Sequence, residues 1–310
     1  MSVNIDCHIH LSCRQVVEHY AAYRGMGYEE MRSALRGGPK RPGAAAHNIS
    51  GEAQMLDIDA AAMVQRWHEM LDTAGIAQGV FMGFAPSCDY MREVCALSGG
   101  RLHAFTSVVP TQADAAEAVR RDVANGFVGV KLYPVVRRFR VNDPAAYEVY
   151  RAAEEMGVPV LIHFGFSTDP TADLAYGNPL DLNPVARDFP EVSFVVAHFG
   201  AGYFREVLAL GYQVPNVHVD TSGTNNWTRY MPYQLSLKDV FAKAFDTLGV
   251  ERVLFGTDSG GGHSGYRTSV LGAQLDVLEQ LGLSATERDL VMAGNAQRVM
   301  RLPASHGAAS

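Results

Sequence analysis

Six side chains that can bind a metal ion or transfer protons stand where short apolar runs of the sequence end. They are His8, His10, Lys131, His163, His198 and Asp258. In Val-Leu-Ile-His163 and Val-Val-Ala-His198, for example, an imidazole follows residues that belong in a hydrophobic core. Burying such groups without partners is costly, so six positions of this kind need a shared explanation.

A divalent metal ion supplies that explanation. His8 and His10 are two residues apart, so on a strand both imidazoles share one face, about 6 to 7 Å apart at Cα, and can bend towards one ion. His163 and Asp258 can reach the same ion from other strands. Three neutral imidazoles and one carboxylate suit zinc, with manganese or iron as alternatives. An open coordination position would hold a water molecule whose pKa falls towards 7.

The hydrophobic pattern predicts the elements that position these residues. Residues 3–11 alternate strictly, with Ile5, Cys7 and Ile9 on one side and the two histidines on the other, which predicts a strand. After residue 57, helical runs and short apolar strands alternate. The predicted strands are 3–11, 79–84, 102–109, 128–133, 159–164, 193–198, 217–221 and 252–257. The predicted helices are 59–73, 89–97, 113–124, 144–156, 182–188, 203–210, 237–248, 270–281 and 286–300.

This alternation predicts an α/β fold, a single (β/α)8 TIM barrel spanning residues 1–302. The segment 12–56 is an insertion after the first strand, either a lid or a dimer arm, with a short helix around residues 28–35. An extra helix ends the barrel, and residues 303–310 form a frayed tail. A Rossmann fold is disfavoured because no G-x-G-x-x-G opens the first helix. The six residues fall at the carboxyl ends of strands, where such barrels carry their active sites.

The composition limits the kinds of molecule that this protein is expected to bind. The 310 residues have a formal net charge of −7, which argues against a nucleic-acid surface and favours a small-molecule substrate. No apolar run is long enough to cross a membrane, and residues 1–6 lack the features of a signal peptide. Four cysteines without a C-x-x-C pair fit a reducing compartment, so we expect a cytoplasmic protein with free thiols. The sequence does not specify the oligomeric state, and a homo-oligomer is compatible with it.

The ordered motifs resemble those of the amidohydrolase superfamily, and within it the amidohydrolase 2 group of predicted metal-dependent hydrolases and aminocarboxymuconate-semialdehyde decarboxylase relatives. The resemblance runs from about residue 3 to residue 300. It implies that His8, His10, His163 and Asp258 hold the metal, and that His198 acts on the bound water or polarises the substrate. The motifs that carry the resemblance are Asp6-x-His8-x-His10, Gly129-Val-Lys131-Leu-Tyr-Pro134, Ile162-His163-Phe-Gly, Ala197-His198-Phe-Gly, Phe255-Gly-Thr-Asp258 and Gly294-Asn295-Ala296.

Lys131 leaves the number of metal ions open. Binuclear members of the superfamily carry a carboxylated lysine on the fourth strand that bridges two metals. The same motif occurs in presumed one-metal members, where the lysine contacts the substrate or pairs with a carboxylate. We therefore expect one ion, and a second if Lys131 is carboxylated.

Three neighbouring features complete the prediction. Asp6 shares the histidine face and either orients an imidazole or makes a structural hydrogen bond. Cys7 faces away from His8 and packs against helices. The run Arg137-Arg138-Phe139-Arg140 follows the fourth strand, where it either binds a substrate carboxylate or forms a solvated basic loop.

The leading functional hypothesis is a metal-dependent hydrolase of a small amide, ester, lactone or cyclic acid. Asp258 or His198 would take a proton from metal-activated water and later protonate the leaving atom. The main alternative is a non-oxidative carboxy-lyase or hydratase acting on an unsaturated or aromatic carboxylate. The decarboxylases of the branch generally lack a lysine at position 131, which favours hydrolysis by resemblance. A binding or scaffolding barrel ranks third, because closed structural zinc sites usually use cysteine.

Overall fold

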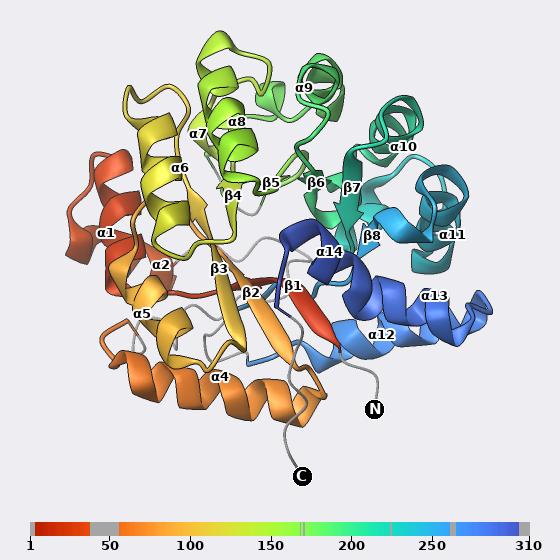
Figure 1. Cartoon of the computed structure of the whole chain (residues 1–310), viewed down its shortest axis with the longest axis horizontal. Helices are drawn as coiled ribbons and strands as arrows, with labels where there is room; N and C mark the ends of the chain where they lie inside the picture. The colour runs from red at the N-terminus through yellow and green to blue at the C-terminus, as the bar shows by residue number, and fades with distance from the viewer. Residues whose placement is uncertain are drawn as a thin grey trace.

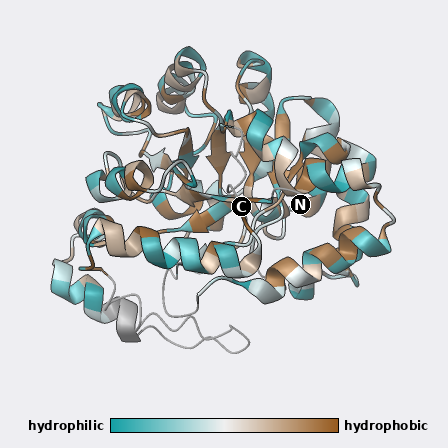
Figure 2. Cartoon of the chain, turned by 60° about the horizontal axis from the view of Figure 1, so that its bottom comes forward, coloured by the Kyte–Doolittle hydropathy of each residue, from teal (hydrophilic) through white to brown (hydrophobic). Residues whose placement is uncertain are grey.

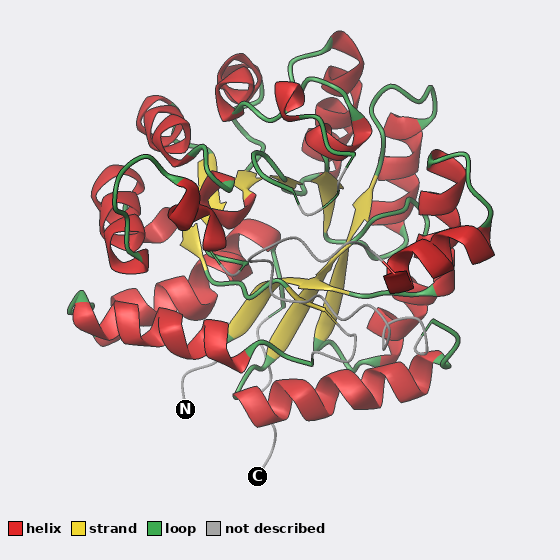
Figure 3. Ribbon diagram, turned by 180° about the vertical axis from the view of Figure 1, so that it is seen from behind, coloured by secondary structure: helices red, strands yellow, loops and turns green. Residues whose placement is uncertain are grey.

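The structure is a computed structural model, and it describes residues 4–37, 56–167, 169, 171–223, 225–260 and 265–303. Its strands are all parallel and follow the order β8-β7-β6-β5-β4-β3-β2-β1-β9, with helices around them (Figures 1 and 3). The strands are β1 (Ile5–His10), β2 (Gln78–Met82), β3 (Leu102–Ser107), β4 (Gly129–Leu132), β5 (Val160–Ile162), β6 (Phe194–Val196), β7 (Val217–Asp220), β8 (Val253–Leu254) and β9 (Ser259–Gly260).

The sheet closes on itself through the segment between β8 and β9. β8 pairs with β7 and β9 pairs with β1. Between them, the backbone N–H of Cys7 donates to the carbonyl of Phe255 (3.0 Å) and the N–H of Asp258 donates to the carbonyl of His8 (2.8 Å). The two short strands are therefore one interrupted eighth strand, and the predicted TIM barrel is confirmed.

The helices of the barrel follow the predicted pattern closely, and α8 has the predicted bounds. Asp59 caps α4 by accepting a hydrogen bond from the N–H of Ala62, and Gly75 ends that helix in the left-handed conformation (φ 68°). The helices are α4 (Ala60–Ala74), α5 (Asp89–Leu97), α6 (Ala115–Ala124), α7 (Pro134–Arg137), α8 (Pro144–Met156), α9 (Leu182–Asp188), α10 (Phe204–Gln213), α11 (Leu237–Leu248), α12 (Thr268–Gln280), α13 (Ala285–Asp289) and α14 (Asn295–Met300).

The insertion after β1 is more regular than predicted. It contains α1 (Arg14–Tyr23), which the sequence analysis missed, and α2 (Tyr28–Gly37), close to the expected short helix. α1 is less amphipathic than α2, which gives its sequence a weaker helical pattern. The rest of the insertion, residues 38–55, and residues 304–310 of the predicted tail lie outside the described residues.

Two hydrophobic layers hold the barrel. The outer layer lies between strands and helices and includes Val130 of β4 and Ile162 of β5. The inner layer fills the barrel with side chains such as Phe105 and Leu161, and α14 closes one end of it with Val299 and Met300. Figure 2 shows the hydrophobic strands enclosed by helices that carry hydrophilic residues as well. In the described part of the chain, no helix has the length and apolarity that crossing a bilayer requires.

The strict alternation predicted for β1 is wrong. The pairing of β1 with β2 shifts register between Asp6 and Ile9. Ile5 and Cys7 belong to the inner layer, whereas Ile9 belongs to the outer one. Cys7 therefore packs with Ile5 in the inner layer, to which α14 also contributes, and not on the outer face with Ile9.

Candidate functional site

The barrel gathers most of the predicted site residues at the carboxyl ends of its strands. The nearest donor atoms of His8, His10 and Asp258 all lie within 4.8 Å of one another. The His10 Nε2 atom is 2.9 Å from Asp258 Oδ1, and the His8 Nε2 atom is 3.9 Å from the same oxygen. Asp258 Oδ2 also accepts a hydrogen bond from Arg267 Nη1 at 3.1 Å.

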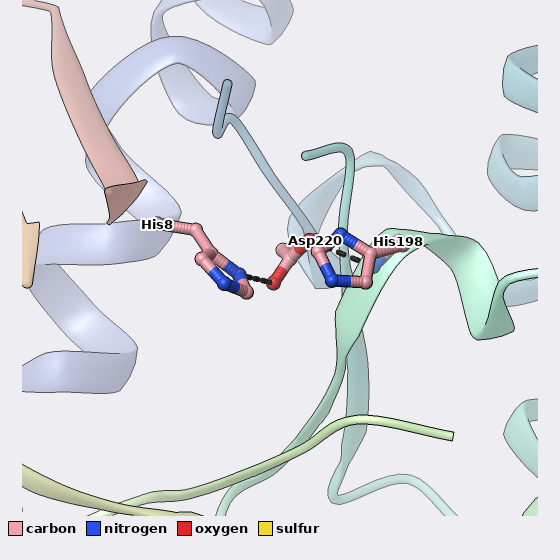
Figure 4. Close-up of side chains that lie close together, drawn as sticks. All are labelled: His8, His198 and Asp220. Atoms are coloured by element: carbon pink, nitrogen blue, oxygen red, sulfur yellow. Dashed lines mark hydrogen bonds and ion pairs between the residues drawn. The ribbon is translucent and has the colours of Figure 1, made fainter. Parts of the chain in front are cut away.

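His8 is fixed in one tautomer by a residue that the sequence analysis did not single out. Its Nδ1 atom lies 2.7 Å from Asp220 Oδ2, and Figure 4 shows this contact with His198 beside it. A carboxylate only accepts, so Nδ1 carries the hydrogen and Nε2 presents a lone pair. That Nε2 atom is buried and has no hydrogen-bond partner. Burial lowers the pKa of His8 to about 3, which keeps the imidazole neutral.

Asp220 organises this part of the site. It ends β7, is fully buried, and forms a second possible ligand group with His8 and His198. Its Oδ1 atom accepts hydrogen bonds from the backbone N–H of His198 (2.9 Å) and of Ser222 (3.0 Å). The sequence signal was a weaker form of the one used elsewhere, a polar residue at the end of the predicted strand Val-His-Val-Asp220. Its position opposite His8 was not visible in the sequence.

His163 and His198 face each other across the site. His198 Nε2 lies 3.1 Å from His163 Nδ1, and His198 Nδ1 lies 2.7 Å from Ser222 Oγ. His163 Nε2 is 3.0 Å from the carbonyl oxygen of Phe166, which only accepts. His163 therefore carries its hydrogen on Nε2, and its Nδ1 accepts a hydrogen bond from His198 Nε2. Among the described residues, His163 belongs to neither three-residue ligand group.

Two of the site residues have strained backbones. His198 (φ 57°) and Asp258 (φ 59°) occupy the left-handed region, which non-glycine residues seldom adopt. Such strain persists only where surrounding contacts impose it, and it concentrates at functional sites. Gly256 allows the close packing beside them, because a Cβ atom there would lie 3.0 Å from His8 Cβ and 3.1 Å from Ser222 Cβ.

Lys131 lies inside the barrel, fully buried, and its Nζ atom has no hydrogen-bond partner. The nitrogen sits 4.9 Å from the ring centre of Tyr133. Burial lowers the pKa of Lys131 to about 7, although Asp220 and Asp258 act in the opposite direction. An unpartnered amine at this depth is suited to contact a bound molecule.

Asp6 makes structural hydrogen bonds, and among the described residues its carboxylate bonds to no imidazole. Its carboxylate accepts from the hydroxyl groups of Thr257 and Tyr266 and from the backbone N–H of Thr257 (3.1 Å). These bonds hold the segment that leads to Asp258. Of the two roles left open for Asp6, the contacts match the structural one.

The arginine run after β4 has one buried arginine and two exposed ones, Arg138 and Arg140. Arg137 is buried, donates to the carbonyl of Phe84 (3.0 Å) and stacks on Tyr23 at 4.0 Å. Arg140 pairs with Asp181 (3.0 Å). The run follows β4 as predicted, and the buried Nη1 atom of Arg137 has no hydrogen-bond partner among the described residues.

The residues present fit a divalent metal ion. The unpartnered Nε2 of His8 lies beside His10 and Asp258, and imidazole nitrogens with one carboxylate are ligands that zinc and related metals accept. The Asp220 contact matches the carboxylate that commonly orients a metal-binding histidine.

Comparisons with known proteins agree with this geometry. The family model Amidohydro_2, described as amidohydrolase, matches residues 5–302. The search of curated proteins found no match.

Solved structures share the fold at low sequence identity. One is a 5-carboxyvanillate decarboxylase variant from Novosphingobium aromaticivorans, solved with bound manganese and 3-methoxy-4-hydroxy-5-nitrobenzoic acid. Its sequence is 15% identical to this chain, its TM-score is 0.69, and the match covers 97% of both chains. The 2,6-dihydroxybenzoate decarboxylase from Rhizobium is 16% identical, with a TM-score of 0.65 over 97% of this chain and 99% of that one. A putative 2-pyrone-4,6-dicarboxylic acid hydrolase from Pseudomonas putida is 16% identical, with a TM-score of 0.62 over 97% of this chain and 98% of that one.

Proposed function

The chain belongs to the amidohydrolase family, and on this premise we propose that it is a metal-dependent hydrolase of a small amide, ester, lactone or cyclic acid. The observation that carries the proposal is the bare, buried Nε2 atom of His8 beside His10 and Asp258. His8, His10 and Asp258 would hold the ion, with His163 as a fourth ligand. Zinc is the proposed metal.

When bound, the metal would polarise a substrate carbonyl and lower the pKa of a water molecule. His198 would transfer the proton between that water and the leaving group, with its ring positioned by the Ser222 hydroxyl beside Nδ1. Arg267 and His10 keep Asp258 ionised and oriented. Lys131 would contact a substrate oxygen through its unpartnered Nζ atom. One ion is proposed, and a second would require a carboxylated Lys131.

A second candidate is a non-oxidative carboxy-lyase acting on an aromatic or unsaturated carboxylate. The decarboxylases of the same fold favour it, one of which binds manganese and a benzoic acid. In that reaction His198 or Asp258 would deliver a proton to carbon. In either case a small carboxylate is the proposed kind of substrate.

One assay separates the two candidates. Protein purified without chelator is analysed for metals and incubated with 2-pyrone-4,6-dicarboxylate, simple esters and lactones, 5-carboxyvanillate and 2,6-dihydroxybenzoate. We expect zinc and hydrolysis of a lactone or ester. Carbon dioxide release from the aromatic acids without any hydrolysis would establish the carboxy-lyase instead. Normal turnover by a metal-stripped His8→Ala/His10→Ala protein would rule out the metal centre.

A further inference from the structure

Two cysteines that the proposed reaction does not use lie in contact near the start of two helices. The Sγ atoms of Cys13 and Cys88 are 3.6 Å apart, and the two residues are 1% and 2% exposed. Cys13 immediately precedes α1 and Cys88 immediately precedes α5. The contact therefore joins the segments that follow two neighbouring strands, β1 and β2.

Hydrogen bonds on both sides hold the two thiols in place. Ser87, with φ 48°, donates from its backbone N–H (2.8 Å) and its hydroxyl group (2.6 Å) to the buried carboxylate of Asp122. The Gln15 side-chain oxygen accepts from the backbone N–H of Tyr90 at 2.8 Å and lies 3.5 Å from Cys88 Sγ. These bonds anchor the backbone on both sides of Cys88 and tie it to Gln15, two residues after Cys13.

We propose that Cys13 and Cys88 form a reversible disulfide when the protein meets a hydroperoxide. A disulfide needs its sulfur atoms about 2.0 Å apart, so the present gap closes by small rotations of both side chains. Cys13 is next to Ser12, which is half-buried, and Arg14, which is exposed, so a local opening at the start of α1 admits a small oxidant.

The two sulfurs have different roles in the reaction. The Cys13 thiolate attacks one peroxide oxygen, the O–O bond breaks, and a sulfenic acid and water form once the leaving oxygen is protonated. Cys88 then attacks Cys13 Sγ, its proton is lost, the S–O bond breaks, and a second water leaves. Two thiols and one hydrogen peroxide thus give one disulfide and two waters, with the sulfurs oxidised by two electrons.

The pKa shifts of the two thiols agree with Cys13 as the residue that attacks the peroxide and Cys88 as the residue that forms the disulfide. The hydrogen bond from Cys88, with help from backbone N–H groups at the start of α1, lowers the pKa of Cys13. The same contact and burial raise the pKa of Cys88. The other two cysteines offer internal comparisons, since Cys7 is enclosed in the barrel and Cys95 is partly buried on α5.

The test is titration of the native protein with hydrogen peroxide, followed by intact mass and non-reducing peptide mapping. We expect a loss of two of the four thiols, a mass lower by two hydrogen atoms, a linked pair of peptides carrying Cys13 and Cys88, and full reversal by a dithiol. The cross-link closes a long loop in the unfolded chain, so the oxidised protein melts higher by on the order of a few degrees.

Two cysteine-to-serine variants test whether the disulfide joins Cys13 to Cys88. Cys95→Ser leaves the disulfide unchanged, whereas Cys88→Ser stops oxidation at a sulfenic acid on Cys13 that a dimedone probe captures. The proposal is overturned if all four thiols survive peroxide, if Cys7 or Cys95 reacts first, or if Cys88→Ser still loses two thiols. None of these measurements uses enzymatic activity, so they do not depend on the proposed function.

Discussion

The Nδ1 atom of His8 lies 2.7 Å from Oδ2 of Asp220, and both residues are fully buried inside the barrel. This contact determines which imidazole nitrogen is bare, and so it decides that Nε2 faces His10 and Asp258. A carboxylate in this position also makes the imidazole a better electron donor.

Replacing Asp220 tests this relationship. We expect Asp220→Asn to weaken metal binding about 10- to 100-fold, because a neutral amide no longer fixes the His8 tautomer. Competition with a chromogenic chelator measures the affinity. Asp246→Asn, at an exposed position on α11, is the control and should bind metal as the parent does. Equal affinities for both variants would contradict the role of Asp220.

Replacing His198 distinguishes a proton-transfer residue from a metal ligand. With the substrate found by the assay above, His198→Asn should lower kcat by about 10²- to 10⁴-fold, since proton transfer is lost. Its metal content should stay that of the parent. Loss of the metal together with activity would instead assign the ion to the group of His8, His198 and Asp220.

Lys131 should show opposite effects on activity and stability. Lys131→Met removes a buried amine that has no hydrogen-bond partner, so the free energy of unfolding should rise by about 1 kcal/mol or more. Turnover should fall because the substrate contact is gone. Urea unfolding measures the change in stability, and the substrate assay above measures the change in turnover. Elemental analysis should find one metal ion per chain. Two ions whose binding depends on bicarbonate would indicate a carboxylated lysine.

Buried His218 makes the stability of the fold depend on pH. Burial, reinforced by Arg298 and Arg252, lowers its pKa from 6.5 to about 3. The unfolded chain therefore binds a proton at this residue near pH 6.5, whereas the folded chain does not until about pH 3. The free energy of unfolding should fall as the pH drops through this window, by up to about 1.4 kcal/mol per pH unit. Above pH 7 this residue contributes no pH dependence.

His218→Gln isolates this contribution. Urea unfolding at pH 7.5 and at successively lower pH values should give a shallower loss of stability for the variant than for the parent. Parallel curves for the two proteins would show that His218 does not carry the effect.

The sequence alone determined the fold and predicted most of the residues that the fold brings together at the candidate site. Apolar runs of strand length that alternate with helical runs require parallel strands with helices outside, and eight of them close into a barrel. Because every parallel strand ends at the same rim, a polar residue at the end of an apolar run marks that rim. His8, His10, His198 and Asp258 were found in this way.

Tertiary structure decided which of these residues meet and in what state. The register shift in β1 leaves Cys7 in the inner layer and Ile9 in the outer one. The sequence pattern did not indicate this shift, because the shift depends on how β1 pairs with β2. Asp220 became the partner of His8 because β7 and β1 flank the interrupted eighth strand, although the two residues are more than 200 positions apart in the chain. The left-handed backbone of His198 and of Asp258 is likewise imposed by surrounding contacts, since residues other than glycine seldom adopt it.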